Sequence, residues 1–254
     1  MGTDTYRYGD FDERVRSITH SVGLIIGAFA VGIIFTLAGF SVAGLFGLTY
    51  ETVSDIPASI QAFGNALQFV GFIAVGWLYL QWYDSDRSLF DLSGPSLRDI
   101  GWVIAGIVSL LVVLNVLGAA LQQFGIEAAA NEAITQGERQ PVYLLYLIPV
   151  TLLFVAPAEE LIFRGLVQGL FRRAYGVLPG VVIASALFGV SHYLALGGQG
   201  SKFAYLAVAA VLGLLLGLLY ERTQNLLVPI LVHGVYNAVI FYLQYLRVTG
   251  QVAA

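Results

Sequence analysis

Seven long apolar stretches separated by polar loops dominate the pattern of hydrophobic and polar positions along the chain. Each is long enough for a helix to cross about 30 Å of hydrocarbon at about 1.5 Å per residue. We expect membrane-spanning helices at 22–48, 60–82, 100–121, 142–174, 177–196, 203–220 and 226–246. An extra break, for example in the long first stretch, would give eight. The segment 122–140 carries three glutamates in a partly helical pattern and is expected to lie at the surface.

This pattern predicts an all-α fold, a polytopic transmembrane helix bundle, and the composition agrees. Of the 254 residues, 58% are hydrophobic and 11% are charged, whereas a soluble domain carries about 25% charged residues. The chain contains no cysteine, so disulfides and thiolate chemistry are excluded. No basic run suits a phosphate backbone, and nucleic acid is therefore not an expected partner.

We divide the chain into four parts: a polar cytoplasmic segment (1–20), amino-terminal transmembrane helices (21–140), a second set of helices with the candidate chemistry (141–246) and a short tail (247–254). The first segment lacks the basic start and short apolar run of a secretory signal. We therefore expect the first helix to be retained in the protein.

The basic residues indicate the orientation of the bundle, because cytoplasmic loops carry an excess of lysine and arginine. With a cytoplasmic amino terminus, eight arginines fall on the cytoplasmic side and three basic residues on the other. The eight are Arg7, Arg14, Arg16, Arg87, Arg98, Arg172, Arg173 and Arg222, and the three are Arg139, Lys202 and Arg247. We predict a multi-pass plasma-membrane protein whose amino terminus is cytoplasmic.

The stretch APAEELIFRGL places charged side chains inside an otherwise apolar helix, where each charge costs roughly 2.5 to 17 kcal/mol. Glu160 and Arg164 are four residues apart, share a helical face and can form an ion pair. Glu159 lies about 100° round the helix from Glu160 and is free to point into a cavity. Alternatively, the three residues cap a wet helix end. Pro157 is expected to distort this helix and to free a carbonyl nearby.

Two further apolar helices carry histidines. His192 follows Phe188 by four residues, so the two rings share a face; a lone histidine of this kind is more often a hydrogen-bonded core residue than a catalyst. His233 and Asn237 also lie four residues apart on one helical face. They can be interhelical hydrogen-bonding groups, worth about 0.6 kcal/mol each, or donors directed at an oxyanion.

Taken together, these side chains supply what the hydrolysis of a peptide bond by water needs. Glu159 can take a proton from water, His192 can position that water, and the pair on the last helix can stabilise the tetrahedral oxyanion. Counting the rise along each helix places this site toward the cytoplasmic half of the membrane.

The motifs EExxxR (Glu159, Glu160, Arg164), FxxxH (Phe188, His192) and HxxxN (His233, Asn237) resemble the CPBP family of intramembrane proteases. That family includes the CAAX prenyl endopeptidases of the Rce1 type and bacterial Abi proteins, and the resemblance covers about 143–242. It implies four catalytic residues, which are Glu159, His192, His233 and Asn237. It also implies three residues that support the architecture, which are Glu160, Arg164 and Phe188.

The resemblance further implies a mechanism without a cofactor, although members of the family were long called metalloproteases. The alternative is zinc held by Glu159, His192 and His233, but the HExxH helix of zinc peptidases is absent. The expected partners are a peptide or lipidated protein substrate and the lipid bilayer. The sequence does not predict the oligomeric state.

We therefore expect an intramembrane endopeptidase that cuts near the carboxyl terminus of a prenylated (CaaX-type) or membrane-associated protein. One alternative is a non-catalytic, immunity-like or peptide-binding membrane protein that keeps the same fold. Another is a solute transporter or proton carrier, because buried glutamate and histidine also mark ion paths. Transporters often contain matching repeats in their two halves, whereas the motifs here lie only in the second half.

Overall fold

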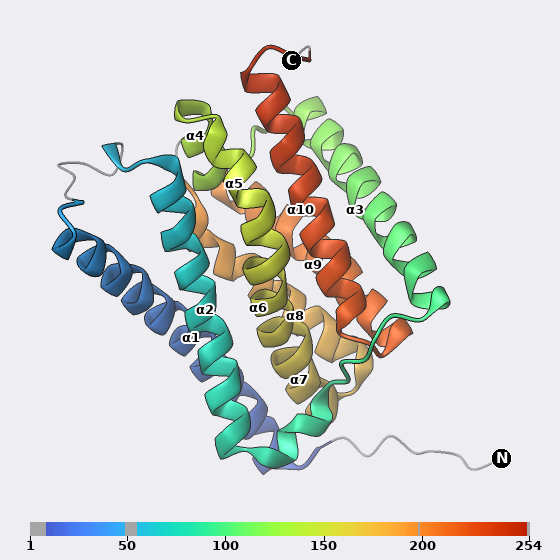
Figure 1. Cartoon of the computed structure of the whole chain (residues 1–254). Coiled ribbons are helices and arrows are strands. Elements are labelled where there is room, and N and C mark those ends of the chain that lie inside the picture. Colours follow the sequence, from blue (N-terminus) through green and yellow to red (C-terminus); the bar gives the residue numbers. More distant parts are fainter. Residues whose placement is uncertain (1–8, 49–54, 198, 253–254) are drawn as a thin grey trace.

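The computed structural model describes residues 9–48, 55–197 and 199–252. Within these residues the chain forms an all-α bundle (Figure 1). Its α-helices are α1 (Phe11–Leu45), α2 (Ala58–Trp82), α3 (Leu97–Gln123), α4 (Glu132–Arg139), α5 (Val142–Val150), α6 (Ala156–Glu160), α7 (Gln168–Tyr175), α8 (Val177–Ser191), α9 (Lys202–Thr223) and α10 (Leu227–Val248).

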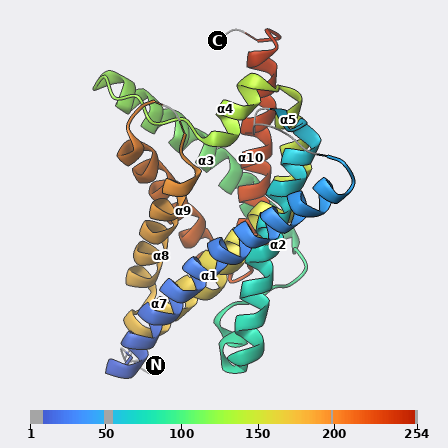
Figure 2. The same cartoon turned by 90° about the vertical axis from the view of Figure 1, so that its left-hand side faces the viewer.

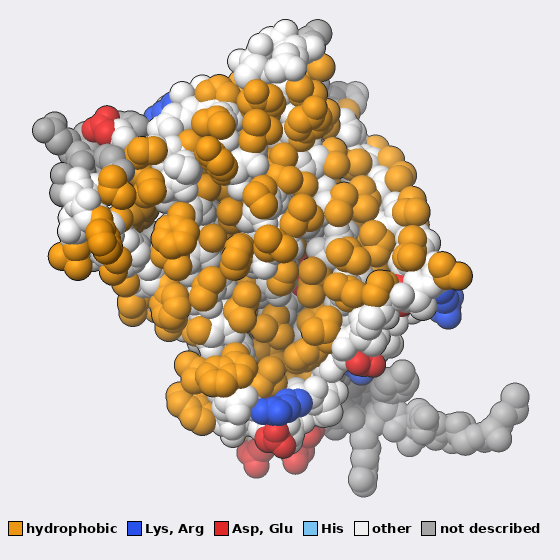
Figure 3. Space-filling model, in the orientation of Figure 1, with side chains coloured by type: hydrophobic (Ala, Val, Ile, Leu, Met, Phe, Trp, Pro, Cys, Tyr) orange, Lys and Arg blue, Asp and Glu red, His pale blue; other side chains and the backbone are white. Residues whose placement is uncertain are grey.

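Seven helical segments of the described chain are long and apolar enough to cross a membrane. One of them is the continuous run Val142–Tyr175, which contains α5, α6 and α7. Large hydrophobic side chains are exposed along the flank of the bundle, and the charged side chains visible in Figure 3 lie mostly near its ends. The predicted fold class is confirmed, with seven spans, and the protein is an integral membrane protein.

The first helix begins at Phe11, well before the predicted start at residue 22. The side chain of Asp10 accepts a hydrogen bond from the backbone amide of Glu13, at 2.9 Å, and so caps the helix. Asp12 and Glu13 lie in the first turn, where negative charge interacts favourably with the helix dipole. Hydropathy alone missed this start because the first turns are polar.

The segment between α3 and α5 is partly helical, as expected. Asn131 caps the short helix α4 by accepting a hydrogen bond from Ala133, at 2.8 Å. The residues before the cap run extended against the loop between α8 and α9. The two segments exchange backbone hydrogen bonds, from Ala129 to Ser201 at 3.1 Å and from Gly197 to Ala130 at 3.2 Å.

Small residues form the closest contacts between helices. The sequence has glycine pairs in GxxxG spacing, such as Gly23/Gly27 and Gly213/Gly217, but not every one of these glycines lies at a helix contact. Helix α1 touches α2 at Gly32 and Gly71, where a Cβ on Gly71 would lie 2.7 Å from the Cα of Gly32. By contrast, no atom lies within 4 Å of the place where Gly23 would carry a Cβ. On α9, a Cβ on Gly213 would lie 2.9 Å from the ring of Phe188. Small residues therefore bring α9 close to the helices that carry the motifs.

A buried carboxylate ties the α1, α2 and α7 ends together. Asp86, in the loop after α2, is 0% exposed. Its oxygens lie 2.8 Å from Nη2 of Arg16 and 2.9 Å from Nη1 of Arg173, and Tyr79 donates its hydroxyl to the same carboxylate. Burial alone would raise the pKa of Asp86, but the bonds from Tyr79 and Arg173 and the charges of both arginines hold it below its usual value.

Replacing this carboxylate by an amide, Asp86→Asn, is expected to lower the free energy of unfolding by about 1.5–3 kcal/mol, the value of a hydrogen bond to a charged group. Because the folded pKa is depressed, the stabilisation is present above the ordinary value of 3.8 and is lost as the pH falls through the folded pKa. Thermal unfolding in detergent at neutral and acidic pH measures this. The control is Asp84→Asn at an exposed position, which should leave the stability nearly unchanged at either pH. A loss of stability for Asp86→Asn that is equal at neutral and acidic pH would contradict the account.

Candidate active site

Two widened helical turns place the glutamates of the first motif. The turns Thr151–Val155 and Leu161–Val167 have π-helical hydrogen bonding and flank α6 on both sides. Pro157, in the first turn of α6, has no N–H to donate to the carbonyl four residues earlier. The distortion predicted near Pro157 is therefore present. Widened turns of this kind are often found at functional sites, because they redirect side chains within a helix.

Glu160 forms the buried centre of the polar cluster. It is 0% exposed, and its Oε2 lies 3.2 Å from Nε of Arg164, so the ion pair expected from the i, i+4 spacing is present. Its other oxygen, Oε1, lies 2.8 Å from Nδ1 of His233. A carboxylate can only accept hydrogen bonds, which assigns the hydrogen to Nδ1. Glu160 therefore fixes the ring orientation of His233.

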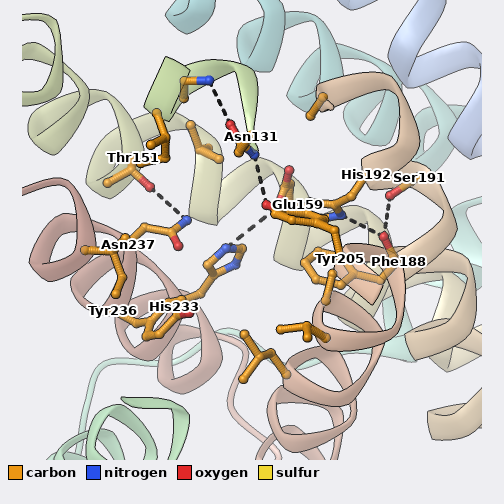
Figure 4. A pocket seen from close by; sticks show the side chains of 18 of the residues that line it. Asn131, Thr151, Glu159, Phe188, Ser191, His192, Tyr205, His233, Tyr236 and Asn237 are labelled. Atoms are coloured by element: carbon orange, nitrogen blue, oxygen red, sulfur yellow. Dashed lines mark hydrogen bonds and ion pairs between the residues drawn. The ribbon is translucent and has the colours of Figure 1, made fainter. Parts of the chain in front are cut away.

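The remaining nitrogen of His233 faces Glu159. Its Nε2 lies 3.7 Å from Oε2 of Glu159, and both side chains are largely but not completely buried. A dashed line joins the two residues in Figure 4. His233 thus lies between two carboxylates, one buried and one at the pocket.

His192 ends α8 and begins a short 3₁₀ turn, His192–Ala195. Its Nδ1 lies 2.8 Å from the carbonyl oxygen of Phe188. Because a carbonyl only accepts, Nδ1 donates, and Nε2 of a neutral ring is left as an acceptor. His192 also lines the pocket, where it can accept a hydrogen bond from water.

The ring of Phe188 packs against three of these side chains. The guanidinium of Arg164 lies 4.3 Å above the ring centroid, and the ring centroids of His192 and His233 lie 4.5 Å and 6.0 Å away. Phe188 is buried and packs edge-on against Phe163 at 5.2 Å. The FxxxH spacing therefore positions two imidazoles and a cation around one aromatic ring.

Asn237 lies one turn beyond His233 on α10. Its Nδ2 donates to Oγ1 of Thr151 at 3.4 Å, which is a long bond, and the second N–H of the amide remains available. Thr151 itself is buried at the start of the first widened turn. Figure 4 shows Asn237 and His233 on the same side of the pocket.

The four residues expected to be catalytic all line one cavity of about 520 Å³. Its lining residues include side chains from α2 and α10 and from α8 and α9. Figure 2 shows these two pairs of helices on opposite sides of the bundle. Most of its other lining residues are apolar, among them Phe69, Leu110, Leu147, Leu212 and Ile240. The structure therefore combines a small polar cluster with a large apolar wall.

Several polar residues of this pocket did not emerge from the sequence, among them Asn131, Thr151 and Tyr205. Nδ2 of Asn131 donates to the hydroxyl of Tyr205 at 2.9 Å, and the ring of Tyr205 lies 6.3 Å from that of His192. These residues come from a loop, a widened turn and the apolar α9, and no local spacing connects them.

Among the residues that the structure describes, no group of three histidines, aspartates or glutamates is arranged to hold a metal ion. The Nδ1 atoms of His192 and His233 are each engaged by an oxygen of the protein, which leaves the two Nε2 atoms for water or for a ligand. The alternative zinc set of Glu159, His192 and His233 stays a prediction.

Comparison with known proteins agrees with the motifs. Residues 141–239 match a family described as type II CAAX prenyl endopeptidase Rce1-like. The matched region is the part of the chain that carries all three motifs. The Rce1-like region contains Glu159, His192, His233 and Asn237, so the resemblance inferred from the sequence is confirmed.

A relative with a weaker match is the uncharacterized protein YpbD of Bacillus subtilis (strain 168). It is 29% identical over 143 residues, which cover 56% of this chain and 69% of YpbD. No solved structure matches significantly. The match to the Rce1-like family supports CAAX-type intramembrane protease activity in general.

Proposed function

We propose that the protein is an intramembrane endopeptidase that hydrolyses a peptide bond near the carboxyl terminus of a prenylated (CaaX-type) or membrane-associated protein. One observation carries this proposal: a carboxylate, two imidazoles and an amide, from three separate spans, line a single cavity. Charged and polar groups at such depth are costly and usually functional.

The first step is the attack of water on the carbonyl carbon of the scissile bond. Water bound between Glu159 and Nε2 of His192 donates a hydrogen bond to each of them. Glu159 removes one proton as the new C–O bond forms. A general base of this kind contributes about 10²–10⁴-fold to the rate.

The second step is stabilisation of the oxyanion that forms at the former carbonyl oxygen. Because Nδ1 of His233 already donates to Glu160, donation from Nε2 requires the imidazolium form. The buried Glu160 carboxylate stabilises that form, and the free N–H of Asn237 supplies a second donor. Glu160 is therefore a positioning residue that acts through His233.

The third step breaks the C–N bond. The tetrahedral intermediate collapses, the carbonyl reforms as part of a carboxylic acid, and the proton held by Glu159 passes to the leaving amine nitrogen. The acid then loses its remaining proton to solvent and leaves as a carboxylate. Glu159 returns to its ionised form, ready for the next water. The same carboxyl group thus serves first as a base and then as an acid.

The apolar lining supports a substrate with an apolar portion close to the scissile bond. The cavity of about 520 Å³ lies in the range typical of small-molecule sites. A lipid chain or apolar side chains can occupy that wall while the peptide bond reaches the polar cluster.

We further propose a plasma-membrane location with a cytoplasmic amino terminus. The start of α1 carries Arg14 and Arg16, and the salt bridges to Asp86 place Arg173 at the same end of the bundle. This enrichment in arginine favours a cytoplasmic position for that end.

The proposal is tested with the purified protein in liposomes and a farnesylated CaaX peptide, with the product identified by mass spectrometry. Asn237→Ala is expected to lower kcat by about 10²–10³-fold, the effect of losing one oxyanion donor, with little change in KM. The matched control is Asn115→Ala, an exposed asparagine on α3, which should keep the parent rate.

Equal rates for the two variants would remove Asn237 from the mechanism. Tight peptide binding by the parent with no cleavage of prenylated or unprenylated peptides would instead favour the non-catalytic, peptide-binding alternative.

A further inference from the structure

The pocket occupies one half of the bundle. On α3 its lining residues run from Leu110 to Leu121, the half nearer α4, and on α5 and α6 they run from Leu147 to Glu159. On α2 they run from Asn65 to Phe72, in the middle of the helix. The ranges on α3, α5 and α6 lie toward the end of the bundle where α4 is located and where α10 ends (Figure 1).

Toward the opposite end, the bundle is filled. Beyond Glu159 the residues Glu160, Ile162, Phe163 and Arg164 are each at most 1% exposed. Val232, directly before His233, is 0% exposed. Closely packed side chains of this kind leave no room for a peptide. The polar cluster is therefore closed toward the end that carries Arg16 and Arg173.

At the α4 end the pocket has a rim of paired backbone. The rim consists of residues 127–131, 196–197 and 199–201, joined by hydrogen bonds that include Ser201 to Glu127 at 2.7 Å. Ala130 and Asn131 line the pocket and are only half-buried, and the same is true of His192 and Ala195. The partly exposed lining residues thus gather at this rim.

The arginine-rich end and the open end of the pocket are therefore opposite ends of the bundle. From them we infer that the active site opens on the non-cytoplasmic side of the membrane, and that the scissile peptide reaches it from there. This inference rests on the proposed function and orientation. It reverses the placement in the cytoplasmic half that counting along straight helices predicted.

The inference narrows the class of substrate. The cleaved segment lies at or beyond the outer face of the membrane, next to an apolar or lipid-bearing portion that enters the cavity. Of the two substrate classes in the proposed function, this selects the membrane-associated one: an exported or membrane-anchored protein, or the outer end of a spanning helix. It disfavours a prenylated (CaaX-type) protein that stays in the cytosol.

The test uses the absence of cysteine from the chain, so that any single cysteine reports one position. Ala195→Cys and Ala130→Cys place a thiol on the pocket lining without touching a catalytic residue. Glu138→Cys, on the exposed face of α4, marks the rim end, and Ser85→Cys, in the exposed loop after α2, marks the arginine-rich end. Each variant is treated with a membrane-impermeant, charged maleimide in spheroplasts and in inverted vesicles.

We expect the cysteines at 195, 130 and 138 to react in spheroplasts, and the cysteine at 85 to react in inverted vesicles only. Reaction of either pocket cysteine from the same side as Ser85→Cys would overturn the inference. A pocket cysteine that reacts only after detergent is added would mean that the pocket opens to lipid, and this would also overturn the inference. Reaction of Ser85→Cys in spheroplasts would overturn it as well. Labelling needs no turnover, so a failure here is distinct from a failure of the proposed cleavage, which the activity of the Glu159→Gln variant tests separately.

Discussion

Glu159→Gln is expected to lower kcat for peptide cleavage by about 10²–10⁴-fold, with little change in KM. The amide has the size of the carboxylate and can still contact water, but it cannot take a proton from it. Binding of the substrate depends on the apolar wall of the cavity, which the substitution leaves intact. Initial rates with a fluorogenic peptide in liposomes, measured at several substrate concentrations, separate the two constants.

The matched control is Glu138→Gln, which makes the same chemical change at an exposed position of α4. This variant should keep the kcat of the parent. A Glu159→Gln variant that retains the parent's kcat would show that Glu159 is not the base. A loss of activity in both variants would point to a general effect of charge rather than to the pocket.

Arg164→Met is expected to lower the free energy of unfolding by about 3–5 kcal/mol. Arg164 is 1% exposed and its partner Glu160 is 0% exposed, so the substitution leaves a buried carboxylate without its cation. The cation above the ring of Phe188 is lost as well. Unfolding of the detergent-solubilised protein, followed by circular dichroism against temperature or denaturant, measures the effect.

Two further variants show whether the ion pair is the cause. The double substitution Glu160→Gln with Arg164→Met removes both charges and should regain most of the stability. It should not regain activity, because His233 no longer has the carboxylate that stabilises its charged form. Arg172→Met, which breaks a partly exposed pair with Glu221, should cost no more than about 1 kcal/mol. Equal destabilisation by Arg164→Met and Arg172→Met would contradict the account.

Hydrophobic patterning predicted the number and order of the spans, because each apolar run here is separated from the next by a loop with clear polar or glycine signals. It failed at the start of α1, where Asp10 caps a helix whose first turns are polar. A capping side chain contributes about 1 kcal/mol to the stability of a helix. The hydropathy averaged over a segment does not detect this contribution.

The sequence also predicted the group of four pocket residues, since the i, i+4 spacings place each pair on one helical face. It did not predict that Glu160 contacts His233 in addition to Arg164, because that bond depends on the approach of α10 to α6. The hydrogen bond between Asn131 and Tyr205 was missed for the same reason. Contacts between distant segments need a tertiary structure.

The side on which the pocket opens is the clearest example of this limit. The number of residues from a helix end gives a depth only if the helix is straight and lies along the membrane normal. Here the widened turns around α6 and the early end of α8 at Ser191 change where the side chains meet. Burial of the residues around Glu160 supports an opening toward the α4 end of the bundle, which residue counting does not reveal.

The central claim, that Glu159 activates a water molecule at this site, is tested most directly by cleavage in ¹⁸O-labelled water with mass spectrometry of the shortened product. The parent protein should give a product whose new carboxyl terminus carries one ¹⁸O atom. The Glu159→Gln variant should give about 10²–10⁴-fold less of this product in the same time at the same concentration. Labelled product formed by Glu159→Gln at the rate of the parent would contradict the claim.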